Sequence, residues 1–369
     1  MCDILKHTTM KIGDKTMKKI HRTLSLLTAA AMCAALLCSC GAVSDSSQTD
    51  SSSKATTTTT GEESSTASVT SAPDSSVSDS SSAVTDDTKT NGITPAMWKV
   101  TSPEGNTMVM LGSFHALKDE CYPLPEAITN AYNNADILAV ECDITSTSED
   151  GEYMKNLMKQ MLYNDNTKLS QHISEEAYSA LQTYLGYWGM DISALEVYRP
   201  WAVSSTLDTL LIQDSDFDSE KGLDNYLLPT AHADGKEIYE VESVDFQMNL
   251  LINFSDDIYD LMFRSFEGET KESQKQALED LYAAWKSGDI ETFLEEDNDE
   301  ELAGYTEEDK KIAEDYNNQM LYDRNKNMAK AAEDLMSQGK NVFYVVGAAH
   351  YAGEGGIIDL LEKDGYTAE

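Results

Sequence analysis

The segment Met108-Val109-Met110-Leu111-Gly112-Ser113-Phe114-His115 is an apolar run that ends at a glycine and is followed by a histidine. The same arrangement recurs near the other end of the chain, in Val342-Phe343-Tyr344-Val345-Val346-Gly347-Ala348-Ala349-His350. Each run predicts a buried β-strand, and a glycine at its end lets another group approach the backbone closely. Because ligands of open α/β sheets bind beyond the carboxyl ends of the strands, we expect His115 and His350 to meet there.

The residues around the first motif predict a hairpin and a βαβ unit. Residues 98–101 and 107–111 flank the turn sequence Ser102-Pro103-Glu104-Gly105-Asn106. Pro125 stands at the start of a predicted helix that reaches about Asn134, and residues 137–143 form another buried strand. A strand, a crossover helix and a second strand make a parallel pair. We therefore expect Glu141 to end a strand adjacent to that of His115.

The rest of the chain predicts an α/β fold. Residues 150–335 are mostly helical, with one strand-like segment at 237–242. The chain closes with a strand at 342–346, the second histidine loop and a helix that ends at Lys363. The predicted architecture is a central mixed, largely parallel sheet with flanking helices and a large helical insertion in the middle of the domain.

The N-terminal residues have the features of an export signal. Residues 17–22 are basic, residues 24–37 are apolar, and Leu37-Cys38-Ser39-Cys40 follows. The apolar stretch is too short to span a bilayer, and its ending resembles the lipobox of bacterial lipoproteins. Residues 17–39 are therefore predicted to be a lipoprotein signal peptide with Cys40 as the lipidated residue; a plain secretory signal is the alternative. Residues 1–16 add nothing recognisable to targeting, so Met17 is a candidate start.

Composition divides the remainder into a tether and a folded domain. Residues 40–92 are rich in Ser, Thr and Asp with almost no large apolar side chain, so they cannot offset their ordering entropy by burial. Residues 93–369 are long enough for one large domain with a substantial core. We expect a bacterial protein that is anchored to the cell membrane by lipid, with its domain on the extracytoplasmic side.

Charge and cysteine content exclude several classes of protein. The chain has 27 basic and 65 acidic residues, a formal charge of −38, so it offers little to neutralise nucleic-acid phosphates. The same charge opposes contact of the domain with an anionic bilayer. Of the six cysteines, only Cys121 and Cys142 lie in the predicted domain, which excludes a disulfide framework. One bridge between them and two free thiols both remain open.

An ordered set of short motifs carries a family resemblance. The set resembles the TraB/PrgY/GumN family, which belongs with the Tiki metalloproteases and, more distantly, with erythromycin esterase and the ChaN haem-binding lipoproteins. The resemblance covers residues 95–367. The matching segments are Gly112-Ser113-Phe114-His115, Tyr122-Pro123-Leu124-Pro125, Ala135-Asp136-Ile137-Leu138-Ala139-Val140-Glu141, Tyr198-Arg199-Pro200-Trp201, Gly222-Leu223-Asp224, Glu242 with Gln247, Arg324-Asn325, and Val345 to Gly356.

These residues permit hydrolytic chemistry at one site. His115, His350 and Glu141 would supply two imidazoles and a carboxylate, a common ligand set for a divalent transition metal such as Mn, Co or Zn. Glu242 is a candidate general base or further ligand, and Arg324 a candidate clamp for a substrate carboxylate or an oxyanion. The resemblance implies a manganese- or cobalt-dependent peptidase that uses paired histidines with Glu and Arg. The alternatives are structural: a salt bridge for Glu141, a place in an amphipathic and acidic strand for Glu242, and a solvated helix face for Arg324.

Three functions are compatible with this set of residues. The first is a tethered metal-dependent hydrolase that acts on peptides or another small substrate. The second, implied by PrgY-, TraB- and ChaN-type relatives, is a lipoprotein that binds a peptide pheromone or haem without turnover. The third is a metal-independent esterase-like hydrolase in which a histidine acts as general base. No feature of the sequence indicates an oligomeric state.

Overall fold

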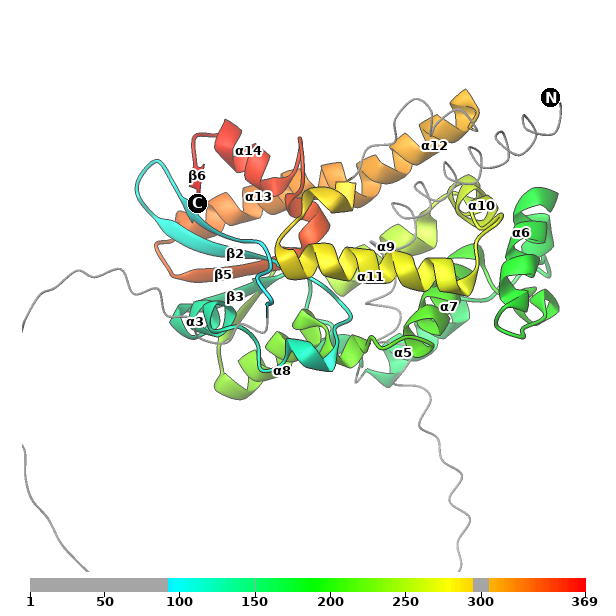
Figure 1. Ribbon diagram of the computed structural model, residues 1–369, viewed down its shortest axis with the longest axis horizontal. Helices are drawn as coiled ribbons and strands as arrows, with labels where there is room; N and C mark the ends of the chain where they lie inside the picture. The colour runs from blue at the N-terminus through cyan, green and yellow to red at the C-terminus, as the bar shows by residue number, and fades with distance from the viewer. Residues whose placement is uncertain (1–91, 149, 295–304) are drawn as a thin grey trace, which may run out of the picture. The chain divides into compact units, whose positions relative to one another are not determined.

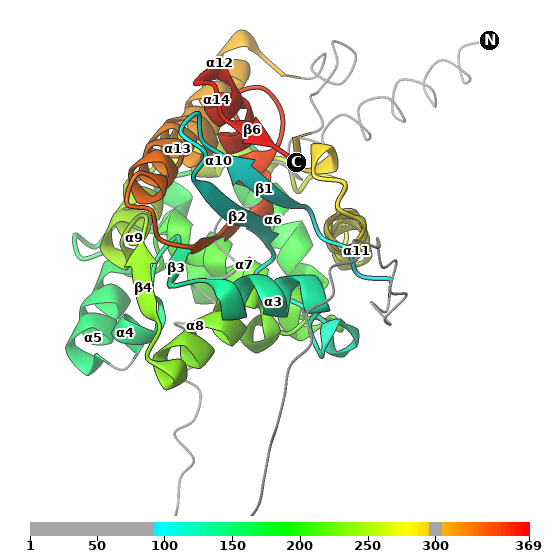
Figure 2. The same ribbon diagram turned by 90° about the vertical axis from the view of Figure 1, so that its left-hand side faces the viewer.

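Six strands form one mixed sheet in the order β4-β3-β5-β2-β1-β6 (Figure 2). The computed structural model describes residues 92–148, 150–294 and 305–369. The predictions for the signal peptide, for lipidation at Cys40 and for nearly all of the tether lie outside these residues. In the described part of the chain, no helix is long and apolar enough to cross a membrane.

Four consecutive strands, starting from the β4 edge, are parallel, and the two at the other edge pair in antiparallel fashion. The strands are β1 (Met97–Thr101), β2 (Thr107–Ser113), β3 (Ile137–Val140), β4 (Glu237–Glu240), β5 (Val342–Gly347) and β6 (Thr367–Ala368). β4, β3, β5 and β2 pair in parallel, whereas β1 pairs antiparallel with β2 and β6. The predicted α/β class with a mixed, largely parallel sheet is therefore confirmed.

The expected adjacency of the strands of His115 and Glu141 is wrong. β5 lies between β2 and β3 and pairs with both, so His350 follows the central strand of the three. The βαβ unit still has parallel strands, but its crossover skips one position. That position is filled by a strand from the far end of the chain, which local sequence cannot reveal. All three strand ends nevertheless lie at the same edge of the sheet.

Alternating side chains of the strands enter two separate cores. In β5, Phe343 and Val345 belong to one core, whereas Val342, Tyr344 and Val346 belong to the other. The second core is closed by α13 (Asp323–Met336) and α14 (Ile357–Lys363), and α3 (Glu126–Asn134) covers the opposite face (Figure 2). This alternation is the period-2 burial of a sheet covered on both sides.

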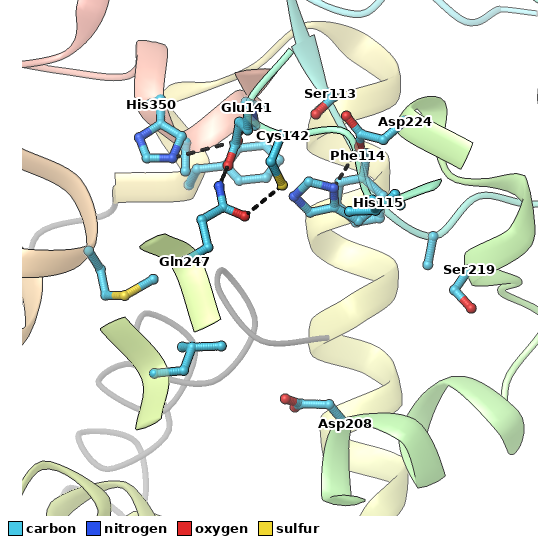
Figure 3. Close-up of a pocket in the computed structure, with 18 of the residues that line it drawn as sticks. Ser113, Phe114, His115, Glu141, Cys142, Asp208, Ser219, Asp224, Gln247 and His350 are labelled. Atoms are coloured by element: carbon cyan, nitrogen blue, oxygen red, sulfur yellow. Dashed lines mark hydrogen bonds and ion pairs between the residues drawn. The ribbon is translucent and has the colours of Figure 1, made fainter. Parts of the chain in front are cut away.

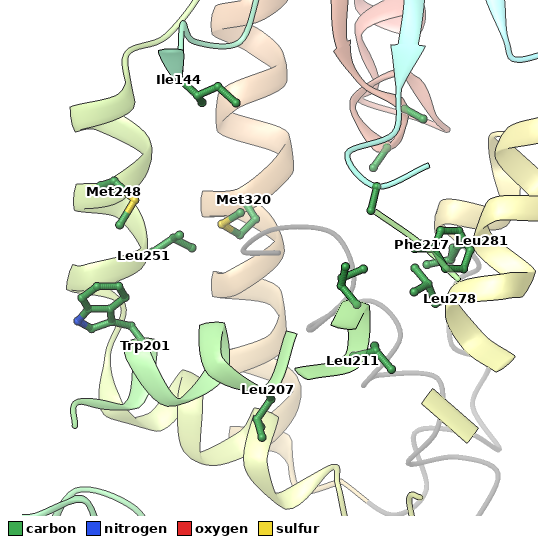
Figure 4. Close-up of a cluster of buried hydrophobic side chains, with 14 of the residues drawn as sticks. Ile144, Trp201, Leu207, Leu211, Phe217, Met248, Leu251, Leu278, Leu281 and Met320 are labelled. Atoms are coloured by element: carbon green, nitrogen blue, oxygen red, sulfur yellow. The ribbon is translucent and has the colours of Figure 1, made fainter. Parts of the chain in front are cut away.

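The first core continues away from the sheet into a large helical region (Figures 1 and 4). Its most apolar helix is α7 (Pro200–Gln213), in which nearly every turn contributes buried side chains. The remaining helices are α4 (Thr145–Ser148), α5 (Gly151–Gln160), α6 (Glu175–Gly186), α8 (Leu223–Asp234), α9 (Val244–Asn253), α10 (Asp256–Arg264), α11 (Lys271–Ser287) and α12 (Glu307–Asn317). A π-helical turn, Asn318–Tyr322, joins α12 to α13.

Most of the predicted elements are present. The hairpin of residues 98–111, the helix after Pro125 and the C-terminal helix to Lys363 are confirmed. The strand predicted at 137–143 ends at Val140, which places Glu141 beyond it, and β6 was not foreseen. Cys121 and Cys142 are both buried and form no disulfide bond, so the bridge between them is excluded.

Gly222 allows α8 to begin directly against the loop that carries His115. A Cβ at Gly222 would lie 2.1 Å from the backbone oxygen of His115, and the N–H of Leu223 donates to the oxygen of Phe114 at 3.2 Å. Because real Cβ atoms do not approach a backbone oxygen so closely, the loop or the helix must move in any larger variant.

Gly222→Ala should therefore destabilise the domain by ~1–3 kcal/mol, the usual cost of overpacking. Gly186→Ala is the matched control, since nothing lies within 4 Å of its added Cβ at the end of α6. The control should leave the free energy of unfolding unchanged or slightly higher. Urea unfolding measures both, and equal stability of the two variants would contradict the close approach described here.

Candidate active site at the strand ends

His115, His350 and Glu141 converge beside Gly347, at the end of β5 (Figure 3). A Cβ on Gly347 would lie 3.1 Å from Glu141 Oε1, 3.7 Å from His115 Nε2 and 3.6 Å from His350 Cδ2. Glu141 Oε1 is itself 3.7 Å from His350 Nε2 and accepts a hydrogen bond from the Gly347 N–H at 2.7 Å. Glycine at this position leaves open the space that these three side chains surround.

Each histidine is oriented by a hydrogen bond at Nδ1. Asp224 Oδ2 lies 2.7 Å from His115 Nδ1, and Asn325 Oδ1 lies 2.6 Å from His350 Nδ1. Because a carboxylate or amide oxygen only accepts, Nδ1 carries the proton in both rings. The Nε2 atoms are then free to face the site. Such a partner on the far nitrogen is typical of metal-ligating histidines.

The surroundings of the two imidazoles differ. Burial, and then the positive charge of Arg324, lower the pKa of His350 to about 3, so this ring is neutral at physiological pH. Burial alone would lower the pKa of His115 as well, but the Asp224 carboxylate outweighs it and the pKa of His115 lies above its usual value. The His115 side chain is also partly exposed, whereas His350 is buried.

Arg324 joins Glu141 to Glu242 in a buried ion network. Its Nη2 donates to Glu141 Oε2 at 2.8 Å and to Glu242 Oε2 at 2.7 Å, and its Nε donates to Glu242 Oε1 at 2.8 Å. Gln247 Nε2 donates to the same two carboxylates at 2.8 and 2.7 Å. The side chains of Arg324 and Glu242 are 7% and 5% exposed, so solvent does little to screen these charges.

The network keeps Glu141 ionised. Burial alone would raise the pKa of Glu141, but the charges of Arg324, His350 and His115 and the Gly347 N–H together lower it. The two carboxylates in turn raise the pKa of Arg324 against the opposing effect of burial. Glu141 therefore presents a permanent negative charge to the site, with Oε2 held by the network and Oε1 turned toward His350.

The contacts of Glu242 and Arg324 are those of positioning residues. Both carboxylate oxygens of Glu242 accept from Arg324, and the third guanidinium nitrogen, Nη1, donates to the carbonyl of Met320. Arg324 is thus buried in the network, not on a solvated helix face. The roles of general base for Glu242 and substrate clamp for Arg324 stay predictions.

The site lies at one end of a cavity of about 110 Å³. Its walls away from the strand ends are largely apolar and come mainly from helices α7, α9 and α11 and from the π-helical turn. They include Leu211, Ile212, Leu251, Leu278, Met320 and Leu321. π-helical turns occur frequently at functional sites, and this one places Met320 and Leu321 in the wall. Asp208 of α7 also lines the cavity, away from the histidines (Figure 3).

Several residues of the site had no role assigned from the sequence. Asp224, Gln247 and Asn325 stood within matching motifs, but their side chains give no local signal because each acts on a partner far away in the chain. Ser113 lines the cavity with its hydroxyl buried and without a hydrogen-bond partner. Gln247 also accepts from the thiol of Cys142 at 3.1 Å.

The donor atoms suit a divalent transition metal in kind. Two Nε2 lone pairs and one carboxylate oxygen face one space, and both Nδ1 atoms are held by hydrogen-bond partners. Two ligands of one such ion, each about 2.1 Å from it, stand about 3–4 Å apart, which the 3.7 Å between His350 and Glu141 satisfies. Within the described residues, however, no group of three or more His, Cys, Asp or Glu side chains is arranged so that it could hold an ion as it stands.

Comparisons with known proteins assign the chain to a family. The sequence model of the TraB/PrgY/gumN family matches residues 96–369, so the chain belongs to this family. It is 25% identical over 290 residues to a protein of Nematostella vectensis named "Metalloprotease TIKI homolog", covering 67% of this chain and 60% of that protein. It is also 25% identical over 157 residues to "Uncharacterized protein YbaP" of Escherichia coli, covering 42% of this chain and 56% of YbaP.

A third relative is also named a metalloprotease. "Metalloprotease TIKI2" of Danio rerio is 25% identical over 164 residues, which is 40% of this chain and 32% of that protein. The chain thus spans at most about three fifths of these curated relatives. No solved structure matches the chain.

Removal of Arg324 tests the ion network. Arg324→Met should destabilise the domain by ~3–5 kcal/mol, because two buried carboxylates lose their counter-charge. Lys330→Met on the same helix removes an exposed ion pair with Asp334 and should cost ~0.5 kcal/mol or less. Urea unfolding distinguishes the two variants. A loss below about 1 kcal/mol in Arg324→Met would show that the network is not structural.

Proposed function

We propose that this protein is a metal-dependent hydrolase that cleaves peptides outside the cytoplasm. The observation that carries the proposal is the convergence of His115 Nε2, His350 Nε2 and Glu141 Oε1 beside Gly347, at one end of an apolar cavity. Pockets of this kind, mostly apolar with a few convergent polar groups, are the usual form of substrate sites.

The ligand set of the proposed site is His115, His350 and Glu141. A divalent transition metal such as Mn, Co or Zn, when bound by these three, would supply an acidified water and a polarised carbonyl for hydrolysis near neutral pH. The neutral state of His350 and the ionised state of Glu141 are the protonation states that ligation requires.

The chain's own residues prepare the site in three ways. Asp224 and Asn325 fix the tautomer and direction of the two imidazoles. Arg324 and Gln247 hold Glu141 Oε2, which leaves Oε1 to face the site. The apolar walls keep water away from the substrate at the reacting end, where electrostatic interactions are therefore stronger.

The named relatives support the class of reaction. Two of the proteins reported above are named metalloproteases, and family membership extends over the residues that form the site. Peptide hydrolysis is consistent both with the names of these relatives and with a site that contains two histidines, a carboxylate and an arginine.

The N-terminal sequence supports a proposal for where the reaction takes place. We propose that lipid on Cys40 anchors the mature protein to the bacterial cell membrane and that residues 40–92 hold the domain away from it on the extracytoplasmic side. The basic residues 17–22, the apolar residues 24–37 and the lipobox-like ending support this arrangement.

Substitution of the histidines tests the site. His115→Ala and His350→Ala should each reduce hydrolysis of a mixed peptide library by about a hundredfold or more, because each variant loses one of the three ligands. His172→Ala is a matched control. His172 Nδ1 also lies 2.7 Å from a carboxylate oxygen, Asp256 Oδ2, but His172 does not line the cavity. Mass spectrometry of the peptides measures the rates, and circular dichroism verifies that each variant is folded.

Two outcomes would contradict this function. If His115→Ala and His350→Ala retain the activity of His172→Ala, the strand-end residues do not catalyse the reaction. If the unaltered protein binds peptide or haem tightly but hydrolyses nothing, it is a binding lipoprotein.

Lipid anchoring has its own test. Cys40→Ser should move the protein from the membrane fraction to the soluble extracytoplasmic fraction, because the thiol that carries the lipid is absent. Ser39→Ala is the control and should leave the protein in the membrane fraction. Retention of Cys40→Ser in membranes, measured by immunoblotting of the fractions, would exclude Cys40 as the anchor.

A further inference from the structure

The far end of the cavity holds a buried carboxylate that forms no ion pair with any residue in the described part of the chain. Asp208 lines the cavity from α7 and is 7% exposed, and its Oδ2 has no hydrogen-bond partner. In Figure 3 it lies well apart from the cluster of His115, Glu141 and His350. Among the described lysines and arginines, none forms an ion pair with Asp208.

A buried, unpaired carboxylate of this kind lowers the stability of the folded state. Burial raises the pKa of Asp208 to about 8, and desolvation is its sole cause. An unpaired buried polar group costs free energy that an apolar residue at the same position would not. On its face of α7, Asp208 has Ser204 and Ser205 on one side and Leu211 and Ile212 on the other, so the face is partly apolar. An unfavourable residue of this kind is expected where function requires it.

The walls between Asp208 and the strand ends are apolar. They include Leu211 and Ile212 of α7, Leu251 of α9 and Leu278 of α11. The cavity of about 110 Å³ can accept a small organic group, given that an engineered cavity of about 150 Å³ binds benzene. An apolar channel that ends in a carboxylate matches a flexible aliphatic stem that ends in a cation.

We propose that this cavity binds a basic side chain of the substrate, lysine or arginine, with its aliphatic stem along the apolar wall and its cationic end against Asp208. The peptide nature of the ligand rests on the proposed function. Asp208 is then a specificity-determining residue, separate from the reacting end. A peptide without a cation leaves the carboxylate unpaired and is disfavoured for that reason.

The other titratable groups near this end do not compete for the cation. Tyr184 of α6 interacts electrostatically with Asp208, but burial raises the pKa of its phenol, which stays neutral. Glu269 does not line the cavity; its Oε2 accepts from Ser273 and Gln274, and its Oε1 is buried without a hydrogen-bond partner. At the strand ends, Glu141 is already ion-paired with Arg324. The net charge of −38 further favours the approach of a cationic ligand.

A pair of probes that differ only in the ammonium group tests the proposal. The full-length protein is titrated calorimetrically at pH 9 with N-acetyl-lysine methylamide and with N-acetyl-norleucine methylamide. The lysine probe should bind roughly tenfold to a hundredfold more tightly, as expected for a charge-assisted hydrogen bond. Asp208→Asn should abolish this preference, whereas the control Asp257→Asn, an exposed aspartate of α10, should keep it.

Proton release is a readout that a structural role would not give. At pH 7 the lysine probe should displace up to about one proton from Asp208, because its pKa of about 8 falls when a cation binds. The norleucine probe should displace none. Calorimetry in two buffers of different ionisation enthalpy measures the release, which should vanish in Asp208→Asn.

Stability against pH provides a measurement without any ligand. Because the folded pKa of Asp208 is raised, the folded state holds a proton that the unfolded state releases, and stability is lost as pH rises from about 4 to about 8. Asp208→Asn should remove this loss and melt at a higher temperature than the unaltered protein at pH 8, with the difference absent at pH 4. A folded, more stable variant that no longer prefers lysine supports the proposal.

The contrary outcomes separate this inference from the proposed function. Equal binding of the two probes, no binding of either, or a lysine preference that survives in Asp208→Asn would overturn the role of Asp208 even if the protein hydrolyses peptides. Because binding is measured without turnover, a lysine preference that depends on Asp208 would stand even if no hydrolysis were found. In that case only the proposed function fails.

Discussion

The ion network of Arg324 with Glu141 and Glu242 is the interaction on which the site depends. It joins the residues that follow β3 and β4 to helix α13, three segments that are far apart in the sequence. Two buried carboxylates would repel each other and lose their charge without the guanidinium between them. With it, Glu141 stays ionised and points one oxygen at the histidines. The same helix supplies Asn325, which orients His350, so α13 positions two of the three converging side chains.

The strand-end cluster and the apolar cavity form one site with two different ends. At the strand ends, Glu141 and Glu242 are paired with Arg324, and neighbouring groups set the protonation states of Glu141 and His350. At the far end, Asp208 Oδ2 has no hydrogen-bond partner, and the burial of Asp208 lowers the stability of the folded state. Because of this contrast, we propose that hydrolysis takes place at the strand ends and that Asp208 selects the substrate. The cavity wall between them is largely apolar, as is usual for small-molecule sites.

Sequence reasoning reached the reacting end because its signal is local. An apolar run that breaks at glycine before a histidine predicts a strand end, and a carboxylate after four apolar residues predicts another; Glu141, His115 and His350 followed from that. The order of the strands could not be predicted in this way, because β5, from the far end of the chain, pairs between β2 and β3. Asp224 and Asn325 resemble ordinary helix residues until their distant partners are known. Asp208 was missed because one polar residue in an apolar helix predicts nothing about what it faces.

The central claim is that a metal bound at the strand ends supports peptide hydrolysis. The most direct measurement uses the full-length protein stripped of metal by a chelator and incubated with a peptide library, with and without added Mn²⁺, Co²⁺ or Zn²⁺. The account predicts that hydrolysis disappears with the chelator and returns with one of these ions, bound at about one equivalent per chain. Hydrolysis that persists undiminished in the chelator, or a protein that takes up none of the three ions, would contradict it.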